Sequence, residues 1–384
     1  MKEGWTYKKL GEVATFMSGY TPAKDDLLCQ GKYPYFKVAE MNIAGNELFM
    51  RNTSLFLDSP KKVFPKGAII FPKNGGAIYT EKKRILEFDS VIDLNTEAIV
   101  PTAEVDLMYL YYWLNYTKIS SFDKGGGLPS LDLKKMSDSI FPVPLISEQH
   151  SIVSRLDAAF AHIDALKANA EKQLAEARQL FQAELAECMR QKEGWEEKKI
   201  GEIFKTYSGG TPTKSNKDYY EGGMIPWIRS GEVCEEYITD SEMCITEKGM
   251  NNSSAKYYPV NTVLVAMYGA TAAQVGILKF KATSNQAVCG ILPHKDFVPE
   301  FVYYWFTKIQ DELAAQAQGG AQPNISQEKI KRVSIPVIPV GEQQTIISHL
   351  DALSANIKKL EELQRKTLAE CDALKQAMLR EVFE

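Results

Sequence analysis

Two long stretches of the chain repeat apolar residues at the three-to-four spacing of an amphipathic helix, without proline or glycine for about 40 residues. The first has Ile152, Leu156, Ala159, Ile163, Leu166, Ala170, Ala177 and Leu180 at these positions. The second has Ile346, Leu350, Leu353, Ile357, Leu360, Thr367, Cys371, Leu374 and Met378. Such helices reach about 60 Å. We predict that they pack on each other as an antiparallel coiled coil, with a local helical hairpin in each stretch as the alternative.

Short apolar runs precede each of these stretches and predict strands. They occur at 67–71 and 97–100 before the first, and at 262–267, 275–278 and 287–292 before the second. Glycine, asparagine and proline separate them. An aromatic-rich helical segment follows in both places, "YLYYWLNYTKI" (109–119) and "FVYYWFTKIQ" (301–310). The pattern indicates compact domains of mixed α/β structure with strand-rich cores.

The chain repeats itself. "KEGWTYKKLGEVATFMSGYTPAK" (2–24) returns as "KEGWEEKKIGEIFKTYSGGTPTK" (192–214). The segment 125–163, which leads into the first long helix, returns as 319–357. The intervening segments differ, so each copy has a common frame and a variable insert. Because identical residues suit the frame, we interpret Trp5 and Trp195 as core anchors.

The predicted fold class is therefore mixed α/β, with two strand-rich domains related by an internal repeat and two long helices packed as an antiparallel coiled coil. We predict a first strand-rich domain at 1–146, a first long helix at 147–191, a second strand-rich domain at 192–340 and a second long helix at 341–384. With 384 residues the chain is long enough for this organisation.

Composition restricts the class of protein. An apolar share of 45% and a charged share of 24% are typical of soluble globular proteins. No run approaches the roughly 18 apolar residues of a membrane span, and the N-terminus does not have the pattern of a signal peptide. The six cysteines and four histidines are scattered along the sequence, so we expect neither disulfides nor a metal site. A reducing cytoplasm is the expected location.

Charge limits any nucleic-acid hypothesis. The net charge is −4, and residues 1–150 carry 18 basic and 18 acidic side chains, against 16 and 18 in residues 192–344. A nucleic-acid surface must therefore be a local patch, or must share its phosphate contacts with partner subunits.

No catalytic constellation is visible in the sequence. "GGTPTKS" (209–215) has Thr213 where a phosphate-binding loop needs glycine, and the first copy reads "GYTPAKD". The Asn-Pro-Pro-Tyr/Phe sequence of amino-methyltransferases is absent, as are helicase and nuclease motifs. We therefore predict no catalytic residues and no cofactor bound by this chain.

The variable inserts carry residues suited to DNA instead. In the first, "FPKNGGAIYTEKKRIL" (71–86) collects cations, an amide and a hydroxyl on a glycine turn, the side chains that contact phosphates and base edges. A solvated hairpin is the alternative. The second insert has amides and hydroxyls in "AMYGATAAQVGILKFKATSNQAV" (266–288), which could instead cap turns. The DNA-binding candidates are Lys24, Lys73, Asn74, Tyr79, Lys82, Lys83, Arg84, Lys214, Arg229, Tyr268, Thr271, Gln274 and Lys279.

With these pieces assembled, the chain resembles the DNA-specificity subunit of type I restriction–modification enzymes. The resemblance covers essentially all 384 residues. It rests on the two openings, on "YPYFKVAEMN" and "IPWIRSGEV", on "FPKNGGAIYTEKKRIL…DLNTEAIVP" and "VLVAMYGATAAQVGIL…SNQAV", and on the two "EQ" turns before the long helices. The chain departs from the family at Gln274, since "GATAAQVGI" has Ala-Ala-Gln where relatives often have a Gly-Lys pair.

The resemblance implies two target-recognition domains, each reading one half of a split DNA site. It implies helices that act as a ruler and dock two methyltransferase subunits, which carry S-adenosylmethionine and methylate adenine N6. Translocating restriction subunits complete the enzyme, which defends the cell against foreign DNA. The coiled-coil and partner candidates are Ile152, Leu156, Ile163, Leu166, Ile346, Leu350, Leu353, Ile357 and Leu360. An autonomous DNA-binding protein, a protein-binding scaffold and a cryptic enzyme are the alternatives.

Overall fold

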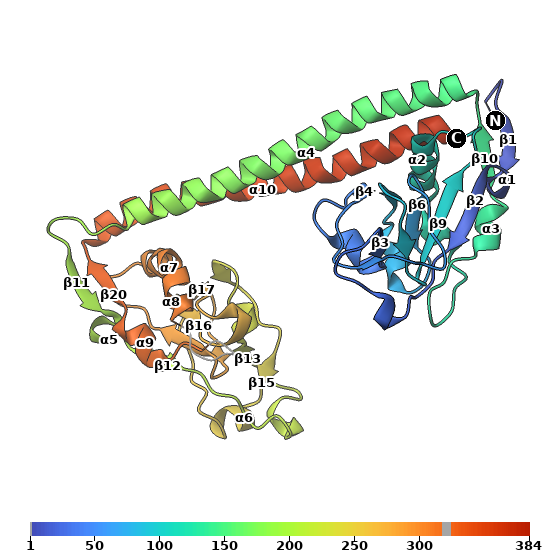
Figure 1. Ribbon diagram of the computed structural model, residues 1–384. Coiled ribbons are helices and arrows are strands. Elements are labelled where there is room, and N and C mark those ends of the chain that lie inside the picture. The colour runs from blue at the N-terminus through green and yellow to red at the C-terminus, as the bar shows by residue number, and fades with distance from the viewer. Residues whose placement is uncertain (1, 317–323) are drawn as a thin grey trace. The chain divides into compact units, whose positions relative to one another are not determined.

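The computed structural model describes residues 2–316 and 324–384, and the chain divides into two units. Unit 1 comprises Met1–Ala170 and Arg365–Glu384, and unit 2 comprises Glu171–Gln364. Each unit therefore contains part of both long helices, α4 (Ile146–Cys188) and α10 (Val340–Phe383), drawn in green and red in Figure 1. The "GGAQP" that begins the second copy of the 125–163 repeat, at 319–323, lies outside the described residues.

Unit 1 contains ten strands in its described residues, together with short helices and the first part of α4. The strands are β1 (Thr6–Lys9), β2 (Ala14–Ser18), β3 (Tyr33–Phe36), β4 (Phe49–Met50), β5 (Phe56–Leu57), β6 (Ile69–Pro72), β7 (Arg84–Leu86), β8 (Val91–Ile92), β9 (Thr96–Pro101) and β10 (Ile140–Val143). The helices before α4 are α1 (Leu10–Val13), α2 (Leu107–Thr117) and α3 (Leu133–Ser137), with 3₁₀ turns η1 (Lys24–Asp26), η2 (Val38–Asn42), η3 (Gly76–Thr80) and η4 (Ile119–Phe122).

Unit 2 repeats this series of elements. Its strands are β11 (Glu196–Lys199), β12 (Thr206–Ser208), β13 (Ile225–Ile228), β14 (Tyr237–Ile238), β15 (Cys244–Ile245), β16 (Val263–Ala266), β17 (Val275–Leu278), β18 (Thr283–Ser284), β19 (Val288–Ile291) and β20 (Ser334–Val337). Its helices are α5 (Ile200–Ile203), α6 (Glu247–Asn251), α7 (Pro299–Lys308), α8 (Gln310–Ala315) and α9 (Gln327–Arg332), with 3₁₀ turns η5 (Lys217–Tyr219), η6 (Ser230–Glu232) and η7 (Gly269–Thr271).

The two units share one sheet topology. Unit 1 has a five-stranded sheet of order β2-β9-β6-β7-β4, and unit 2 has the equivalent order β12-β19-β16-β17-β14. A three-stranded sheet accompanies each, β5-β3-β8 and β15-β13-β18. Both larger sheets are mixed, because the β4–β7 and β14–β17 pairs are parallel and the other pairs are antiparallel. The predicted fold class, two strand-rich mixed α/β domains with two long packed helices, is confirmed.

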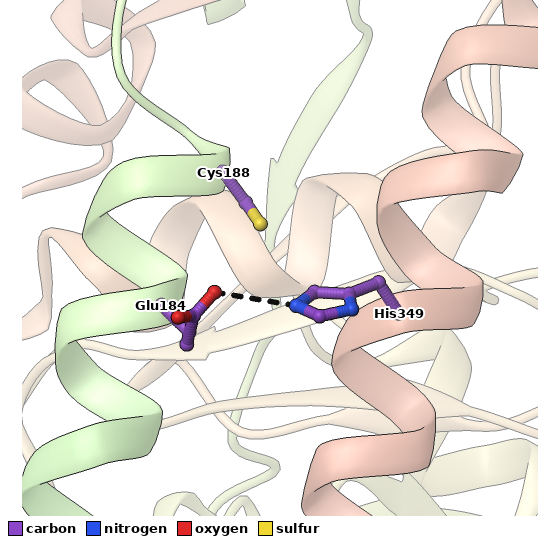
Figure 2. Close-up of side chains that lie close together, drawn as sticks. All are labelled: Glu184, Cys188 and His349. Carbon is purple, nitrogen blue, oxygen red and sulfur yellow. Dashed lines mark hydrogen bonds and ion pairs between the residues drawn. The ribbon is translucent and has the colours of Figure 1, made fainter.

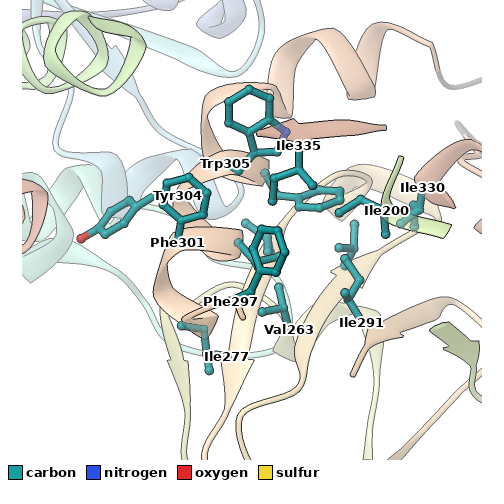
Figure 3. Close-up of a cluster of buried hydrophobic side chains, with 14 of the residues drawn as sticks. Ile200, Val263, Ile277, Ile291, Phe297, Phe301, Tyr304, Trp305, Ile330 and Ile335 are labelled. Atoms are coloured by element: carbon teal, nitrogen blue, oxygen red, sulfur yellow. The ribbon is translucent and has the colours of Figure 1, made fainter. Parts of the chain in front are cut away.

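Each unit buries its own core between the large sheet, an aromatic helix and a long helix. In unit 2, Phe301, Tyr304 and Trp305 of α7 pack on the isoleucines and valines of β16, β17 and β19 (Figure 3). In unit 1, the corresponding helix α2 supplies Tyr109 and Trp113. The aromatic segments read from the sequence are therefore the elements that join each sheet to the helices, and burying such large side chains is a major source of folding free energy.

The duplicated Trp and "EQ" residues join each long helix to its domain by the same hydrogen bonds. Trp5 donates from Nε1 to the Glu148 carboxylate at 2.8 Å, and Trp195 donates to Glu342 at 3.2 Å. The next residue in each "EQ" pair is glutamine and is fully buried, with three backbone partners. Gln149 accepts from Asp106 N and donates to two backbone carbonyl oxygens, Glu104 O and Pro144 O, all at 2.8–2.9 Å.

Gln343 repeats these bonds in unit 2, accepting from Val298 N and donating to Asp296 O and Ile338 O. Because a buried amide is stable only when its polar atoms are paired, the glutamine fixes where the helix leaves the sheet.

The glycine in each "SG-x-TP" opening is required by close packing. A Cβ on Gly19 would lie 2.1 Å from Asp93 O, and one on Gly209 would lie 2.2 Å from Ser284 O. Both distances are far below van der Waals contact, so any side chain would push β2 or β12 away from its neighbouring loop. The repeated opening therefore keeps its glycine because both units bring equivalent backbone segments into close contact.

In unit 1, α4 and α10 pack through positions spaced alternately four and three residues apart, as in a coiled coil. From α4 these are Val153, Leu156, Phe160, Ile163, Lys167 and Ala170. Lys167 pairs with Asp372 at 2.8 Å and Asp164 pairs with Lys375, so the earlier residue of α4 meets the later residue of α10 and the helices run antiparallel.

The coiled-coil candidates differ in their burial. Ile152, Leu156 and Ile163 are buried in unit 1, and Ile346 and Leu350 are buried in unit 2, where Leu353, Ile357 and Leu360 are half-buried. The prediction that places Leu166 between the helices is wrong, because its side chain is 57% exposed. The strict seven-residue repeat assigns that position to Lys167, whose aliphatic stem packs while its ammonium group reaches Asp372.

Candidate nucleic-acid interface

The first candidate loop of unit 1 connects β6 to β7 through the 3₁₀ turn η3. Gly75, with φ of +76°, begins the turn, and its amide donates to Pro129 O at 2.8 Å. The loop therefore crosses from the centre of the five-stranded sheet toward the segment after η4. The loop and the first residue of β7 carry six of the residues proposed from the sequence as DNA contacts: Lys73, Asn74, Tyr79, Lys82, Lys83 and Arg84.

Three of these cations are engaged by the protein itself. Lys73 Nζ lies 3.0 Å from the buried Glu97 carboxylate. The Lys83 side chain is 2% exposed, and its Nζ lies 2.9 Å from the Glu81 carboxylate. Burial lowers the pKa of Lys83, and the Glu81 charge opposes that shift. Arg84 donates to the backbone oxygens of Lys83 and Met41.

These bonds give Lys83 and Arg84 a structural part in the loop. With only 2% of its side chain exposed, Lys83 cannot meet a phosphate in this conformation, so it is removed from the DNA-binding candidates.

The remaining candidates of unit 1 are accessible. Tyr79 is 57% exposed, and its hydroxyl donates to the Asp123 carboxylate. Lys82 is half-buried and reaches Asn42, while the Asn74 amide lies 3.4 Å from the Asn95 side chain. Lys24 is exposed on η1. These side chains reach the surface, but Tyr79 and Lys82 would have to give up their present partners to bind a ligand.

The equivalent loop of unit 2 connects β16 to β17 through η7. Its candidates, and Lys279 just after β17, are half-buried: Thr271 donates to Tyr268 O at 3.3 Å, and Lys279 lies between Glu300 and Asn261 at 3.1 and 3.2 Å. Lys279 also stands 4.5 Å from the centre of the Tyr237 ring. Gln274 Oε1 is buried and has no hydrogen-bond partner among residues 2–316 and 324–384. An unpaired buried acceptor of this kind is costly for a protein to maintain.

Lys214 and Arg229 instead lie at a cavity of about 330 Å³ in unit 2. The other lining residues are Thr211, Tyr220, Trp227, Met243, Asn285 and Gln286. Trp227 is held by a bond from its Nε1 to Gly210 O at 2.9 Å, and Arg229 bonds Glu232 at 3.1 Å and also Glu242. The cavity combines an aromatic wall, two cations and two amides.

Sequence reasoning named Lys214, Arg229 and the two amides, but it missed the aromatic and apolar part of this lining. Trp227 comes from β13, Asn285 and Gln286 follow β18, and Thr211 belongs to the repeated opening. These segments meet because β13 and β18 pair in parallel, with Trp227 opposite Thr283. The amides stood in the sequence as polar residues of the insert, but nothing in it signalled their approach to Trp227.

Unit 1 presents different side chains at the equivalent place. The parallel β3–β8 pair sets Tyr35 opposite Val91, as β13–β18 sets Trp227 opposite Thr283. The matching positions then carry Lys37 in place of Arg229, and Asp93 and Leu94 in place of Asn285 and Gln286. Tyr35 is buried, which raises its pKa to about 12. One backbone arrangement thus carries two different sets of side chains.

Comparison with known sequences agrees with the duplication. The family described as "Type I restriction modification DNA specificity domain" matches residues 2–176 and again residues 192–370. The chain belongs to this family. Its two matched regions correspond to the two copies of the frame, and both extend into the long helices.

Named relatives are specificity subunits. A type I restriction enzyme specificity subunit of Escherichia coli is 28% identical over 289 residues, covering 71% of this chain and 70% of that protein. A specificity subunit of Methanocaldococcus jannaschii is 35% identical over 184 residues, covering 46% of this chain and 42% of that protein.

Solved structures share the family fold. One comes from a study of the structural basis of complex assembly and conformational transition of the type I R-M system. The match covers 100% of this chain and 98% of the solved chain, with a TM-score of 0.81 at 18% identity. The HsdS subunit from Thermoanaerobacter tengcongensis covers 99% and 97%, with a TM-score of 0.58 at 18% identity. Within the described part of this family member, no helix is long and apolar enough to cross a membrane.

Proposed function

We propose that the chain is the DNA-specificity subunit of a type I restriction–modification enzyme and that each unit binds one half of a split DNA target. The observation that carries this proposal is that one frame occurs twice with different side chains at equivalent places. A duplicated frame suits two tasks of the same kind, and different side chains suit two different base sequences. The match of both copies to the family supports the same conclusion.

The reading residues are the accessible polar groups of the variable segments. In unit 2 they include Lys214, Arg229 and Gln286 at the cavity, and in unit 1 they include Lys24, Tyr79 and Lys82. Arginine pairs well with guanine and glutamine with adenine in the major groove, while lysine chiefly contacts phosphates. The buried Gln149 and Gln343, with all their bonds inside the frame, serve as its supports.

The boundaries proposed for this division of labour are 1–146 and 192–340 for the recognition domains and 147–191 and 341–384 for the spacer helices. The 43 residues of α4 correspond to about 64 Å of helix. A ruler of fixed length sets how many base pairs separate the half-sites. The exposed apolar residues of the helices, including Leu166 and Leu180, are available to dock methyltransferase subunits.

Charge supports a shared DNA surface. At a net charge of −4 the chain lacks the basic excess that gives strong phosphate binding, so binding by the subunit alone is weak and sensitive to salt. Methyltransferase subunits, which carry S-adenosylmethionine, and restriction subunits supply the remaining contacts and the chemistry, while this chain is not catalytic and binds no cofactor for the reaction. The six free thiols suit a cytoplasmic location.

The decisive experiment maps N6-methyladenine in the host genome with and without this chain, and then with Gln286→Ala. We expect loss of one bipartite motif without the chain, and relaxed specificity in one half of that motif with Gln286→Ala. Losing one base contact costs about 1–3 kcal/mol of discrimination. Lys198→Ala, on exposed β11 in the repeated opening, is the matched control and should leave the motif unchanged.

Two outcomes contradict the proposal. An unchanged methylation pattern without the chain would exclude the specificity role. Strong sequence-specific binding by the purified chain, unaffected by methyltransferase, would favour an autonomous DNA-binding protein.

A further inference from the structure

The last turn of α4 and the third turn of α10 bring together three side chains in unit 2 that are common metal ligands. Glu184 and Cys188 lie one turn apart on α4, and His349 faces them from α10 (Figure 2). The carboxylate oxygen, the thiol sulfur and the imidazole nitrogen all lie within 4.8 Å of one another. Their side chains remain partly open to solvent, with His349 57% and Glu184 42% exposed.

The packing of the two helices does not require these residues. Glu184 and Cys188 occupy the positions, spaced by four residues, that face α10 in unit 2. The two copies are offset by 194 positions. Glu184 and Cys188 therefore correspond to Met378 and Val382 of unit 1, and His349 corresponds to Arg155. Unit 1 thus builds the same junction with two apolar side chains and a cation, none of which is a good ligand for zinc or similar ions.

We propose that Glu184, Cys188 and His349 bind one zinc-class transition-metal ion, with water at the fourth position. Ligand atoms around tetrahedral Zn²⁺ lie 2.0–2.3 Å from the metal and hence roughly 3.5 Å from each other. His349 Nε2 already lies 3.3 Å from Glu184 Oε2. The sulfur needs to move by roughly 1 Å, which rotation about the Cys188 side-chain bonds allows.

The chemistry of the ligands selects the class of metal. One thiolate and one imidazole favour zinc and similar ions, whereas Mg²⁺ and Ca²⁺ prefer sites made of oxygen ligands. Because two ligands come from α4 and one from α10, the ion links the end of one helix to the beginning of the other. The expected role is to hold this helix pair together in unit 2, which is independent of which bases the domain reads.

Titration of the full-length chain with Co²⁺ tests the site, since a cobalt–thiolate bond produces a charge-transfer absorption. We expect one Co²⁺ per chain, displaced by Zn²⁺, with this absorption present. Cys188→Ser should abolish the absorption, and His349→Gln and Glu184→Gln should weaken binding about tenfold or more. Cys234→Ser and His294→Gln, in the same unit but outside the cluster, are matched controls and should behave as the unaltered chain.

A variant that copies unit 1 separates metal binding from folding. The triple substitution Glu184→Met, Cys188→Val and His349→Arg should fold, because unit 1 uses these residues at the same junction, but it should bind no Co²⁺. Zinc should raise the melting temperature of the unaltered chain and not that of the triple variant. The proposal is overturned if Co²⁺ gives no thiolate absorption, or if the absorption persists in Cys188→Ser.

Discussion

Unit 1 and unit 2 are two versions of one structure. Positions where their residues are the same have a different role from positions where their residues differ. Both use a Trp–Glu hydrogen bond, a buried glutamine with three backbone partners and a glycine pressed against a neighbouring backbone oxygen. At the cavity of unit 2, by contrast, Arg229 and Gln286 stand where unit 1 has Lys37 and Leu94. Agreement therefore marks the support, and difference marks the surface that is free to specify a ligand.

A second difference lies at the helix junction. Unit 2 places Glu184, Cys188 and His349 where unit 1 has Met378, Val382 and Arg155. Both sets close the same helix pair, one by apolar packing and the other by groups that can share a metal ion. The frame thus permits two chemical solutions to one packing problem.

The largest effect is expected from removing the buried glutamine of either unit. Gln149→Leu leaves Asp106 N and two carbonyl oxygens without this partner. Gln343→Leu leaves the three equivalent backbone groups of unit 2 without theirs. Each should lower the free energy of unfolding of its own unit by about 2–4 kcal/mol. Hydrogen exchange of peptides from each unit measures this, with exposed Gln173→Ala as the control.

If only one of the two glutamine variants were destabilised, the two glutamines would not have equivalent structural roles, and the proposed equivalence of the two frames would be wrong.

Next in size is the glycine of each opening. Gly19→Ala and Gly209→Ala force a Cβ to within 2.2 Å of a backbone oxygen, so each unit should lose about 1–3 kcal/mol through displaced backbone. Gly76→Ala and Gly231→Ala provide one control in each unit, because a Cβ there meets nothing within 4 Å. Urea unfolding compares the four variants, and equal stability of Gly19→Ala and Gly76→Ala would refute the packing argument.

The smallest effect is expected at the tyrosine that joins each aromatic helix to a long helix. Tyr112 donates to Asp157 in unit 1, and Tyr304 donates to Asp351 at 2.6 Å in unit 2. Burial, reinforced by these hydrogen bonds, raises the pKa of both hydroxyls above the usual tyrosine range. Tyr112→Phe and Tyr304→Phe should each cost about 0.5–1.5 kcal/mol.

Double-mutant cycles of Tyr112→Phe with Asp157→Asn, and of Tyr304→Phe with Asp351→Asn, measure the coupling between hydroxyl and carboxylate in the two units. A coupling energy of zero in either unit would show that the tyrosine packs there without help from its hydrogen bond.

Much of the fold could be predicted from the sequence because local spacing governs it. The periodic positions of 152–180 and 346–378 indicated the long helices, and the two openings indicated two copies of one frame. Burial was harder to predict, as Leu166 shows: it fits the helical pattern, but the side of the helix that it occupies is set by its partner helix. The candidate interface was the least predictable part. In the sequence Lys83 resembled a free cation, but in the structure it is buried and paired with Glu81.

The sequence by itself determined the duplication, the helices and the residue types available for binding, because these follow from order and periodicity along one chain. Only the tertiary structure decided which of those residues meet. Trp227 reaches Gln286 through the parallel pairing of β13 with β18, and His349 reaches Glu184 across 165 positions of sequence. The scattered cysteines and histidines predicted no metal site, since distance along the chain says nothing of distance through space once two long helices pack antiparallel.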